Sequence, residues 1–205
     1  MTETEFNSTE QKASYGIGMQ MGEQLSTAFA DVSLSAALAG IEDAFAGNEP
    51  RVNPAEINQA FQIIQQQLKE QQAQNSAQFA ADGEAFLKQN AKRDEVTVLP
   101  SGLQYEIIET GDGDKPSASS TVRTHYRGTL IDGTEFDSSY SRNQPTEFPV
   151  NGVIAGWTEA LQLMPAGSKW KLFIPYQLAY GEQGAGGAIG PYQALVFEIE
   201  LLDIL

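Results

Sequence analysis

The chain has 205 residues, with 27 acidic and 12 basic side chains, one histidine and no cysteine. The lack of cysteine excludes disulfides, thiolate metal sites, iron–sulfur clusters and a cysteine nucleophile, and a single histidine excludes a multi-histidine metal site. A formal charge of −15 argues against nucleic acid and anionic membranes as partners, because both are bound through clustered lysine and arginine.

The first residues, MTETEFNSTEQ, carry neither the basic nor the apolar segment of a secretory signal peptide. No stretch approaches the about 18 consecutive apolar residues that a membrane helix needs. We therefore expect a cytoplasmic protein without a membrane partner.

Helical patterns fill the first part of the chain. A first helix is predicted to begin near Ser8, which stands three residues before Gln11 in the spacing of a capping box. A second helix is predicted between Ser33 as N-cap and Gly47 as the glycine that ends it. Its apolar residues recur every three or four positions, at Leu34, Leu38, Ile41 and Phe45.

Asn53 and Pro54 predict the start of a third helix, because an N-cap residue is followed by proline at the first helical position. From residue 65 to 78 the chain is almost wholly polar and rich in glutamine. Since a helix that is polar on all sides commonly bridges domains through solvent, we predict one continuous helix of about 37 residues, roughly 55 Å long. The alternative is two helices, broken near Asn75 or Gly83.

The helical segments before residue 53 offer only a weak core, and a piece of that size is marginally stable on its own. Two copies could bury their apolar faces together, so we predict dimerisation through residues 1–70. The alternative is that these helices fold back onto the C-terminal part. Gly16, Gly18 and Gly22 in the first helix each cost about 1 kcal/mol relative to alanine, and close approach of another helix would offset that cost.

From about Glu95 the pattern becomes that of strands, with β-branched and aromatic residues alternating with polar ones. In the segment 169–174, for example, the residues 169, 171 and 173 alternate with 170, 172 and 174 and predict a half-buried strand, in which Trp170 and Phe173 are core or surface packing. Strands are predicted at Leu103–Ile108, Thr121–Leu130, Lys169–Ile174 and Ala194–Leu202, with one short helix at Gly156–Leu163. We therefore predict an α+β domain in which an antiparallel sheet wraps around one helix.

Three domains follow from these patterns. They are a helical dimerisation domain at 1–52, a long connecting helix at 53–94 whose first turns join the dimer core, and the sheet domain at 95–205.

Three features point only weakly to other chemistry. The glycine-rich run 181–190 lacks the spacing of a nucleotide-binding loop. Asp112 and Asp114 begin like a calcium loop, but Pro116 stands where a ligand is required. His125 is not accompanied by a G-x-S-x-G motif, so we expect it to be structural. The sequence thus predicts no cofactor and no metal.

Four segments of the second half carry a family pattern. They are HYRGTLIDGTEFDSSYSRNQP (125–145), FPVNGVIAGWTEALQLMPAGSKWKLFIP (148–175), LAYGEQG (178–184) and ALVFEIELLDI (194–204). Together they resemble the FKBP family of peptidyl-prolyl cis-trans isomerases, from about Leu99 to Leu205. The preceding helices resemble those of the cytoplasmic bacterial FKBPs of this chain's mass, 22.2 kDa, and of the related macrophage infectivity potentiator proteins.

That subgroup is known for V-shaped homodimers joined through their N-terminal domains. The resemblance implies an isomerase that accelerates the folding of proline-containing, unfolded or partly folded polypeptides, with chaperone-like client binding by the dimer cleft. It also implies inhibition by macrolides of the FK506 type. The alternative is a binding module with an inactive pocket.

Prolyl isomerisation requires no covalent chemistry. Rotation about the bond crosses a barrier of about 18–20 kcal/mol that arises from amide resonance, and the twisted state has less charge separation than the planar one. A dry aromatic pocket should therefore favour the twisted state without a nucleophile, metal or cofactor.

The resemblance also implies the site residues. The catalytic residues are Tyr126, Phe136, Asp137 and Tyr180, and the substrate-binding residues are Arg142, Phe148, Val153, Ile154, Trp157, Ile189 and Phe197. Trp157 would form the floor under the proline ring, while the Ile154 N–H and the Tyr180 hydroxyl would hold substrate carbonyls. Asp137, paired with Arg142 and Tyr126, would act as an orienting charge rather than as a proton-transfer base.

Overall fold

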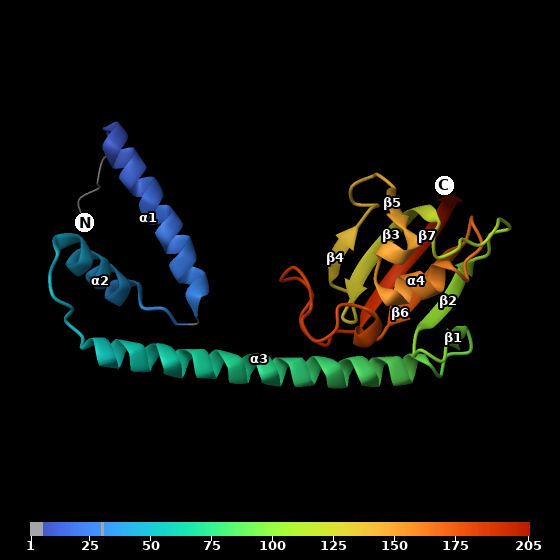
Figure 1. The fold of residues 1–205 in the computed structure, drawn as a ribbon, viewed down its shortest axis with the longest axis horizontal. Coiled ribbons are helices and arrows are strands. Elements are labelled where there is room, and N and C mark those ends of the chain that lie inside the picture. Colours follow the sequence, from blue (N-terminus) through green and yellow to red (C-terminus); the bar gives the residue numbers. More distant parts are fainter. Residues whose placement is uncertain (1–5, 30) are drawn as a thin grey trace. The chain divides into compact units, whose positions relative to one another are not determined.

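The computed structural model describes residues 6–29 and 31–205 (Figure 1). The chain forms two compact units that divide between Gln72 and Ala73, inside the long helix α3. None of the helices in the described residues combines the length and the apolar character that crossing a membrane requires.

Two helices precede the long one. Helix α1 spans Thr9–Ala28 and begins with the predicted capping box, in which Ser8 Oγ accepts from the Gln11 N–H and the Gln11 side chain accepts from the Ser8 N–H. Helix α2 spans Leu34–Ala46 and ends at Gly47, which takes the left-handed conformation with φ 70°. The predicted starts of both helices and the glycine stop are therefore confirmed.

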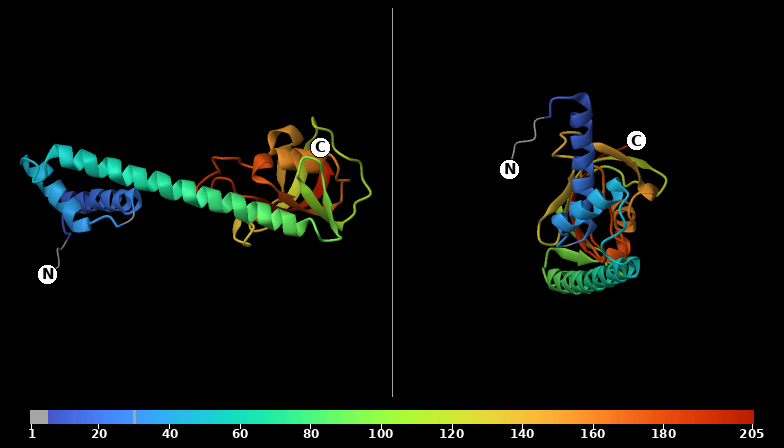
Figure 2. Two further views of the ribbon diagram at one scale, coloured as in Figure 1. Left: turned by 90° about the horizontal axis from the view of Figure 1, so that it is seen from below. Right: turned by 90° about the vertical axis from the view of Figure 1, so that its left-hand side faces the viewer.

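Helix α3 runs without interruption through Pro54–Asn90, as the two further views in Figure 2 also show. Asn53 Oδ1 accepts from the Ala55 N–H at 2.8 Å and caps its first turn. The prediction of one continuous helix is confirmed, and the alternative of a break at Asn75 or Gly83 is wrong.

The last turns of α3 pack onto the sheet of the second unit. Gly83 is buried there, and a Cβ at this position would lie 3.1 Å from the Ala194 Cβ. Asn90 Nδ2 donates to Gln104 Oε1 at 2.9 Å, and Gln104 Nε2 donates to the Leu87 carbonyl at 2.9 Å. The compact C-terminal unit consequently begins at Ala73, inside the helix, whereas the change to a strand pattern in the sequence predicts a boundary at residue 95.

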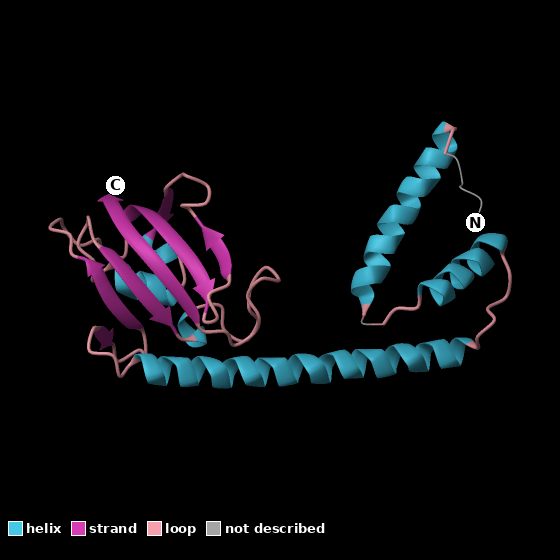
Figure 3. Cartoon of the chain, turned by 180° about the vertical axis from the view of Figure 1, so that it is seen from behind, coloured by secondary structure: helices cyan, strands magenta, loops and turns pink. Residues whose placement is uncertain are grey.

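Within the described residues, seven strands form one antiparallel sheet (Figure 3). The strands are β1 Val96–Val98, β2 Gln104–Glu109, β3 Thr121–Leu130, β4 Glu135–Ser138, β5 Thr146–Pro149, β6 Lys169–Ile174 and β7 Leu195–Ile204. Their order is β1-β2-β6-β7-β3-β4, and β5 also pairs with β3. Helix α4, Ala155–Leu161, and two 3-10 turns, Val150–Gly152 and Tyr176–Leu178, complete the unit. The predicted α+β class is confirmed.

One face of the sheet and α4 form the hydrophobic core. Trp157 and Leu161 of α4 are buried together with Leu172 of β6 and Ile199 of β7. The sequence leaves Phe173 of β6 open between core and surface packing, and the structure buries it, with only 2% of the residue exposed. The end of α3 covers this side of the sheet, because the Phe86 and Phe173 ring centroids lie 6.0 Å apart.

Candidate active site

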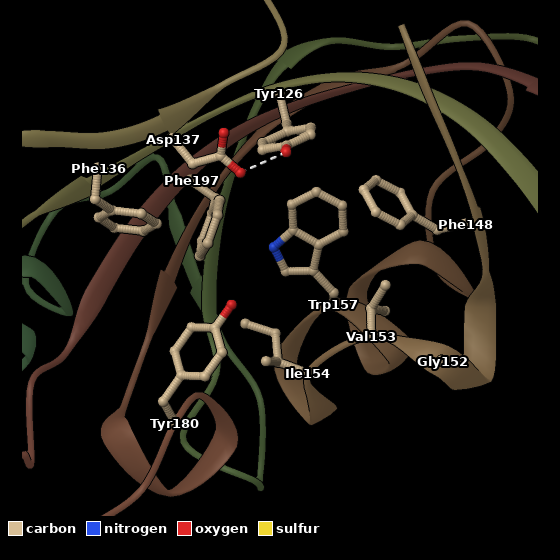
Figure 4. Close-up of a pocket in the computed structure, with 10 residues that line it drawn as sticks. All are labelled: Tyr126, Phe136, Asp137, Phe148, Gly152, Val153, Ile154, Trp157, Tyr180 and Phe197. Atoms are coloured by element: carbon tan, nitrogen blue, oxygen red, sulfur yellow. Dashed lines mark hydrogen bonds between the residues drawn. The ribbon is translucent and has the colours of Figure 1, made fainter. Parts of the chain in front are cut away.

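Aromatic side chains line a cavity of about 430 Å³ in the sheet unit (Figure 4). Its lining consists of Tyr126, Phe136, Asp137, Phe148, Gly152, Val153, Ile154, Trp157, Tyr180 and Phe197. The five phenylalanine, tyrosine and tryptophan residues other than Tyr180 come from β3, β4, β5, α4 and β7, so the fold gathers residues that are far apart in the sequence. All predicted site residues except Arg142 and Ile189 lie in this lining.

Trp157 lies at the centre of the aromatic packing and is only 3% exposed. Its ring meets those of Tyr126, Phe148 and Phe197 edge to face, with centroids 5.3, 5.6 and 5.2 Å apart. Phe136 meets Phe197 in the same manner at 5.5 Å. Aromatic pairs prefer this geometry because the positive edge of one ring faces the negative face of the other. The cavity wall is therefore fixed by the packing of the rings on one another.

Asp137 lies at the edge of the cavity and is held by two partners. The Tyr126 hydroxyl donates to Asp137 Oδ2 at 2.6 Å, and Arg142 Nη1 donates to Asp137 Oδ1. Arg142 Nη2 also donates to the Tyr126 hydroxyl at 2.9 Å, and the guanidinium carbon lies 5.7 Å from the centroid of the Tyr126 ring. The three side chains thus form a closed hydrogen-bonded group.

These contacts set the ionisation of Asp137. Partial burial alone would raise the pKa of Asp137, but the hydrogen bonds from Tyr126 and Arg142, together with the guanidinium charge, outweigh burial and lower this pKa below its ordinary value. Burial, followed by the hydrogen bond to Asp137, raises the pKa of Tyr126. At neutral pH the group therefore contains a carboxylate, a neutral phenol and a guanidinium.

Two hydrogen-bond donors of the cavity are available to a ligand. The Tyr180 side chain points its hydroxyl into the cavity in Figure 4, and Ile154 lines it beside Trp157. Within the described part of the chain, neither the Tyr180 hydroxyl nor the Ile154 N–H has a hydrogen-bond partner. Burial, and then the negative charge of Asp137, raise the pKa of Tyr180, so this phenol remains a donor at neutral pH.

Three residues differ in placement from the sequence-based set. Ile189 is buried in the hydrophobic core and pairs with Ala185 through the backbone, and it does not line the cavity. Arg142 lies outside the lining but contacts Asp137 and Tyr126 directly. Gly152 lines the cavity and was missed, because a glycine offers no side chain whose chemistry a sequence pattern could reveal.

Two family models match the chain. FKBP-type peptidyl-prolyl cis-trans isomerase matches residues 113–202, and the domain amino terminal to FKBP-type peptidyl-prolyl isomerase matches residues 10–107. The chain is 50% identical over 206 residues to the FKBP-type 22 kDa peptidyl-prolyl cis-trans isomerase of Escherichia coli (strain K12), with 100% of both chains covered. It is 38% identical over 205 residues to the peptidyl-prolyl cis-trans isomerase Mip of Coxiella burnetii, with 98% of this chain and 89% of that protein covered. The crystal structure of FkpA from Escherichia coli matches with a TM-score of 0.71 and 36% identity over 98% of each chain.

Proposed function

We propose that this chain, which belongs to the FKBP-type peptidyl-prolyl cis-trans isomerases, binds the proline ring of its substrate over Trp157 in the aromatic cavity. Membership confirms the resemblance seen in the sequence, and the chain is a prolyl isomerase. The alternative of a non-catalytic binding module is not supported. The observation that carries the proline site is a single cavity that combines edge-to-face aromatic rings, an ionised carboxylate and two unpaired donors.

The cavity can lower the rotation barrier by replacing the water around the prolyl bond with a hydrophobic wall. The planar amide has more charge separation than the twisted amide, so water stabilises the planar state more strongly than a hydrophobic wall does. The rings of Trp157, Tyr126, Phe148 and Phe197 replace water around the proline ring. Each tenfold acceleration then requires about 1.4 kcal/mol of preference for the twisted state.

Three polar groups orient the substrate in this proposal. The Ile154 N–H and the Tyr180 hydroxyl donate to carbonyl oxygens on the two sides of the rotating bond. The Asp137 carboxylate faces the rotating imide as a fixed negative charge. Because Tyr126 and Arg142 hold its oxygens and lower its pKa, the Asp137 carboxylate is a weak base and acts through its charge.

The two tryptophans of the chain allow a direct test of the proline site. Trp157 lines the cavity, whereas Trp170 lies in the core and stacks on Tyr105 with centroids 4.3 Å apart. Addition of a macrolide of the FK506 type should change tryptophan emission in the wild type and in Trp170→Phe but not in Trp157→Phe. An undiminished response in Trp157→Phe would place the ligand elsewhere.

We also propose that the N-terminal helices pair with a second copy of the chain. Among the described residues 6–72 only Asp43 is buried, so the apolar side chains of these helices face outward. Phe45 is 95% exposed, and Tyr15, Ile17, Leu38 and Phe61 are exposed as well. Apart from the adjoining residues and the backbone of α1 itself, no atom of the described residues lies within 4 Å of a Cβ built at Gly16, Gly18 or Gly22, which leaves these glycines open to a partner helix. Exposed apolar surface of this extent supports an interface between copies.

Client binding by the dimer is the third part of the proposal. Two linked weak sites retain one unfolded chain better than either site alone, because the second contact forms at a high effective concentration. A truncated chain that begins at Ala73 should therefore isomerise short peptides as fast as the full chain but accelerate protein refolding less. Equal losses on peptide and protein substrates would contradict this division between the units.

A further inference from the structure

The histidine of the chain lies directly behind the cavity wall. His125 precedes Tyr126 on β3, and neighbouring residues of a strand point to opposite faces of the sheet. The His125 ring stacks on Tyr140 with centroids 4.7 Å apart and planes inclined by 14°. Its Nδ1 lies 2.9 Å from Ser139 Oγ. The Tyr140 hydroxyl donates to Glu200 at 2.9 Å, which holds the stacked ring in place.

Ser139 is fully buried and forms hydrogen bonds with both the backbone N–H and the backbone carbonyl of Tyr126. The Tyr126 N–H donates to Ser139 Oγ at 2.7 Å, and the Tyr126 carbonyl accepts from the Ser139 N–H at 2.9 Å. The Ser139 hydroxyl also donates to the Tyr126 carbonyl at 3.2 Å. Ser139 thereby fixes the position of the backbone from which the Tyr126 side chain extends.

The number of protons decides the role of His125. A serine hydroxyl has one proton to donate and two lone pairs that accept. One lone pair accepts the Tyr126 N–H, so the hydroxyl proton has two acceptors within reach, the Tyr126 carbonyl at 3.2 Å and a deprotonated His125 Nδ1 at 2.9 Å. All three contacts are hydrogen bonds at once only when His125 Nδ1 carries the proton, donates to Ser139 Oγ and leaves the serine proton to the Tyr126 carbonyl.

Ser139 also supports the turn that carries Arg142. The Ser139 carbonyl accepts from the Gln144 N–H at 3.2 Å, and the Tyr140 carbonyl accepts from the Asn143 N–H at 2.9 Å. This turn brings the Arg142 guanidinium to Asp137 and to the Tyr126 hydroxyl. Both partners of Asp137 are thus attached to the same buried serine, Tyr126 through its backbone and Arg142 through its turn.

We propose that His125 is a positioning residue of the isomerase site, which fixes Ser139 through an Nδ1–H donor and so holds Tyr126 and Arg142 at Asp137. His125 does not touch the cavity and acts only through these residues. The inference rests on the proposed role of Asp137 in the cavity.

Two substitutions of His125 separate hydrogen bonding from packing. In His125→Asn the side-chain amide can place an N–H donor where Nδ1 lies, while the ring is lost. In His125→Phe the ring can still stack on Tyr140, but the donor is lost. The proposal expects kcat on a proline-containing tetrapeptide to fall about tenfold in His125→Phe, with KM little changed, and to stay within about twofold of wild type in His125→Asn. A purely structural role for the ring predicts the reverse order and would overturn the proposal.

Nuclear magnetic resonance gives a readout that does not depend on activity. Because the chain has one histidine, its imidazole nitrogens give a single set of signals. At mildly alkaline pH, the nitrogen shifts should show the proton on Nδ1 in the wild type. They should move toward the values of free neutral histidine in Ser139→Ala. A proton on Nε2 alone in the wild type would overturn the assignment.

The serine has a matched control. Ser139→Ala removes a buried hydroxyl with three contacts, and Thr124→Val removes a buried hydroxyl that has no partner in the described residues. We expect kcat to fall in Ser139→Ala and to remain unchanged in Thr124→Val. Equal kcat values in the two variants would contradict the proposal.

Asp137→Leu, measured in parallel, distinguishes a failure of the positioning role of His125 from a failure of the proposed role of Asp137. If Asp137→Leu loses activity while His125→Phe and Ser139→Ala keep it, only the positioning role fails. If Asp137→Leu keeps full activity, the proposed role of Asp137 fails and the positioning role is overturned with it.

Discussion

Gly128 lies on β3 where the rings of Phe136 and Phe197 meet. A Cβ at this position would lie 2.6 Å from Phe136 and 2.7 Å from Phe197, closer than real Cβ atoms approach other atoms. The close contact of the two rings in the cavity wall therefore depends on the missing side chain at residue 128.

Gly128→Ala should displace these rings and widen the cavity. We expect a loss of stability of about 1–3 kcal/mol, the usual cost of overpacking. We expect kcat/KM on a proline-containing peptide to fall at least tenfold. Thermal unfolding and the peptide assay would measure both effects. An alanine variant with wild-type activity would show that the wall tolerates rearrangement.

The acid side of the pH profile should report on Asp137. Its pKa is lowered in the folded protein, so the carboxylate persists below the ordinary range and activity is lost only as pH falls through this lowered value. Arg142→Gln removes the hydrogen bond from the guanidinium to Asp137 and one positive charge, and the loss of both raises the pKa of Asp137. Loss of activity should then begin at a higher pH than in the wild type.

The pH dependence of the activity is best recorded by nuclear magnetic resonance exchange spectroscopy on a proline-containing peptide, because this assay requires no coupling protease. Arg123→Gln is a suitable control, because Arg123 is paired with Glu147 and Asp203 on the exterior and does not contact Asp137. If the pH profiles of Arg142→Gln and the wild type superimpose, Arg142 does not set the ionisation of Asp137.

The elements of the chain differ in how far their sequences reveal them. The strands at 121–130 and 169–174 were predicted with the observed bounds, because they are long and alternate regularly. Strands β1, β4 and β5 were not predicted, since each has only three or four residues, which is too short for an alternating pattern to stand out in the sequence. The strand pattern alone leaves the placement of Phe173 open between core and surface packing, because its cover, Phe86 on α3, is distant in the sequence.

The end of α3 should stabilise the isomerase unit. A chain that begins at Glu95 lacks Phe86, which covers Phe173, and Asn90, which pairs with Gln104. Exposure of a buried phenylalanine costs about 1.5–3 kcal/mol. We therefore expect the chain beginning at Glu95 to unfold several degrees below the chain beginning at Ala73. Equal melting temperatures in calorimetry would show that these turns contribute nothing.

The helices of the first unit should govern the oligomeric state. Light scattering of the wild type should give a mass near twice 22.2 kDa. Phe45→Glu replaces the exposed aromatic ring of α2 with a charged side chain and should shift the mass toward that of one chain. Ile107→Glu, at an exposed position of β2, is the control and should leave the mass unchanged. A wild-type mass near 22.2 kDa would refute the dimer.

For the whole molecule, the sequence was more informative about the site than about the arrangement around it. Tyr126, Phe136, Asp137 and Trp157 were recognised from contiguous motifs, and the fold brings them to one cavity. Ile189 was misplaced because its buried position depends on a backbone pairing with Ala185 that the motif does not encode. The network behind Tyr126 escaped detection because a lone histidine in a strand carries no chemical signature until its partners are known.

The central claim is that this cavity, with its ionised Asp137, catalyses rotation of the prolyl bond. The most direct measurement is the cis-to-trans relaxation rate of a short Xaa-Leu-Pro-Phe peptide with the wild type, Asp137→Leu and the control Asp203→Leu, whose carboxylate lies on the exterior beside Arg123. We predict strong acceleration by the wild type and by Asp203→Leu, and a rate reduced at least tenfold in a folded Asp137→Leu. Equal acceleration by all three proteins would contradict the claim, because the active site would then lie outside this group.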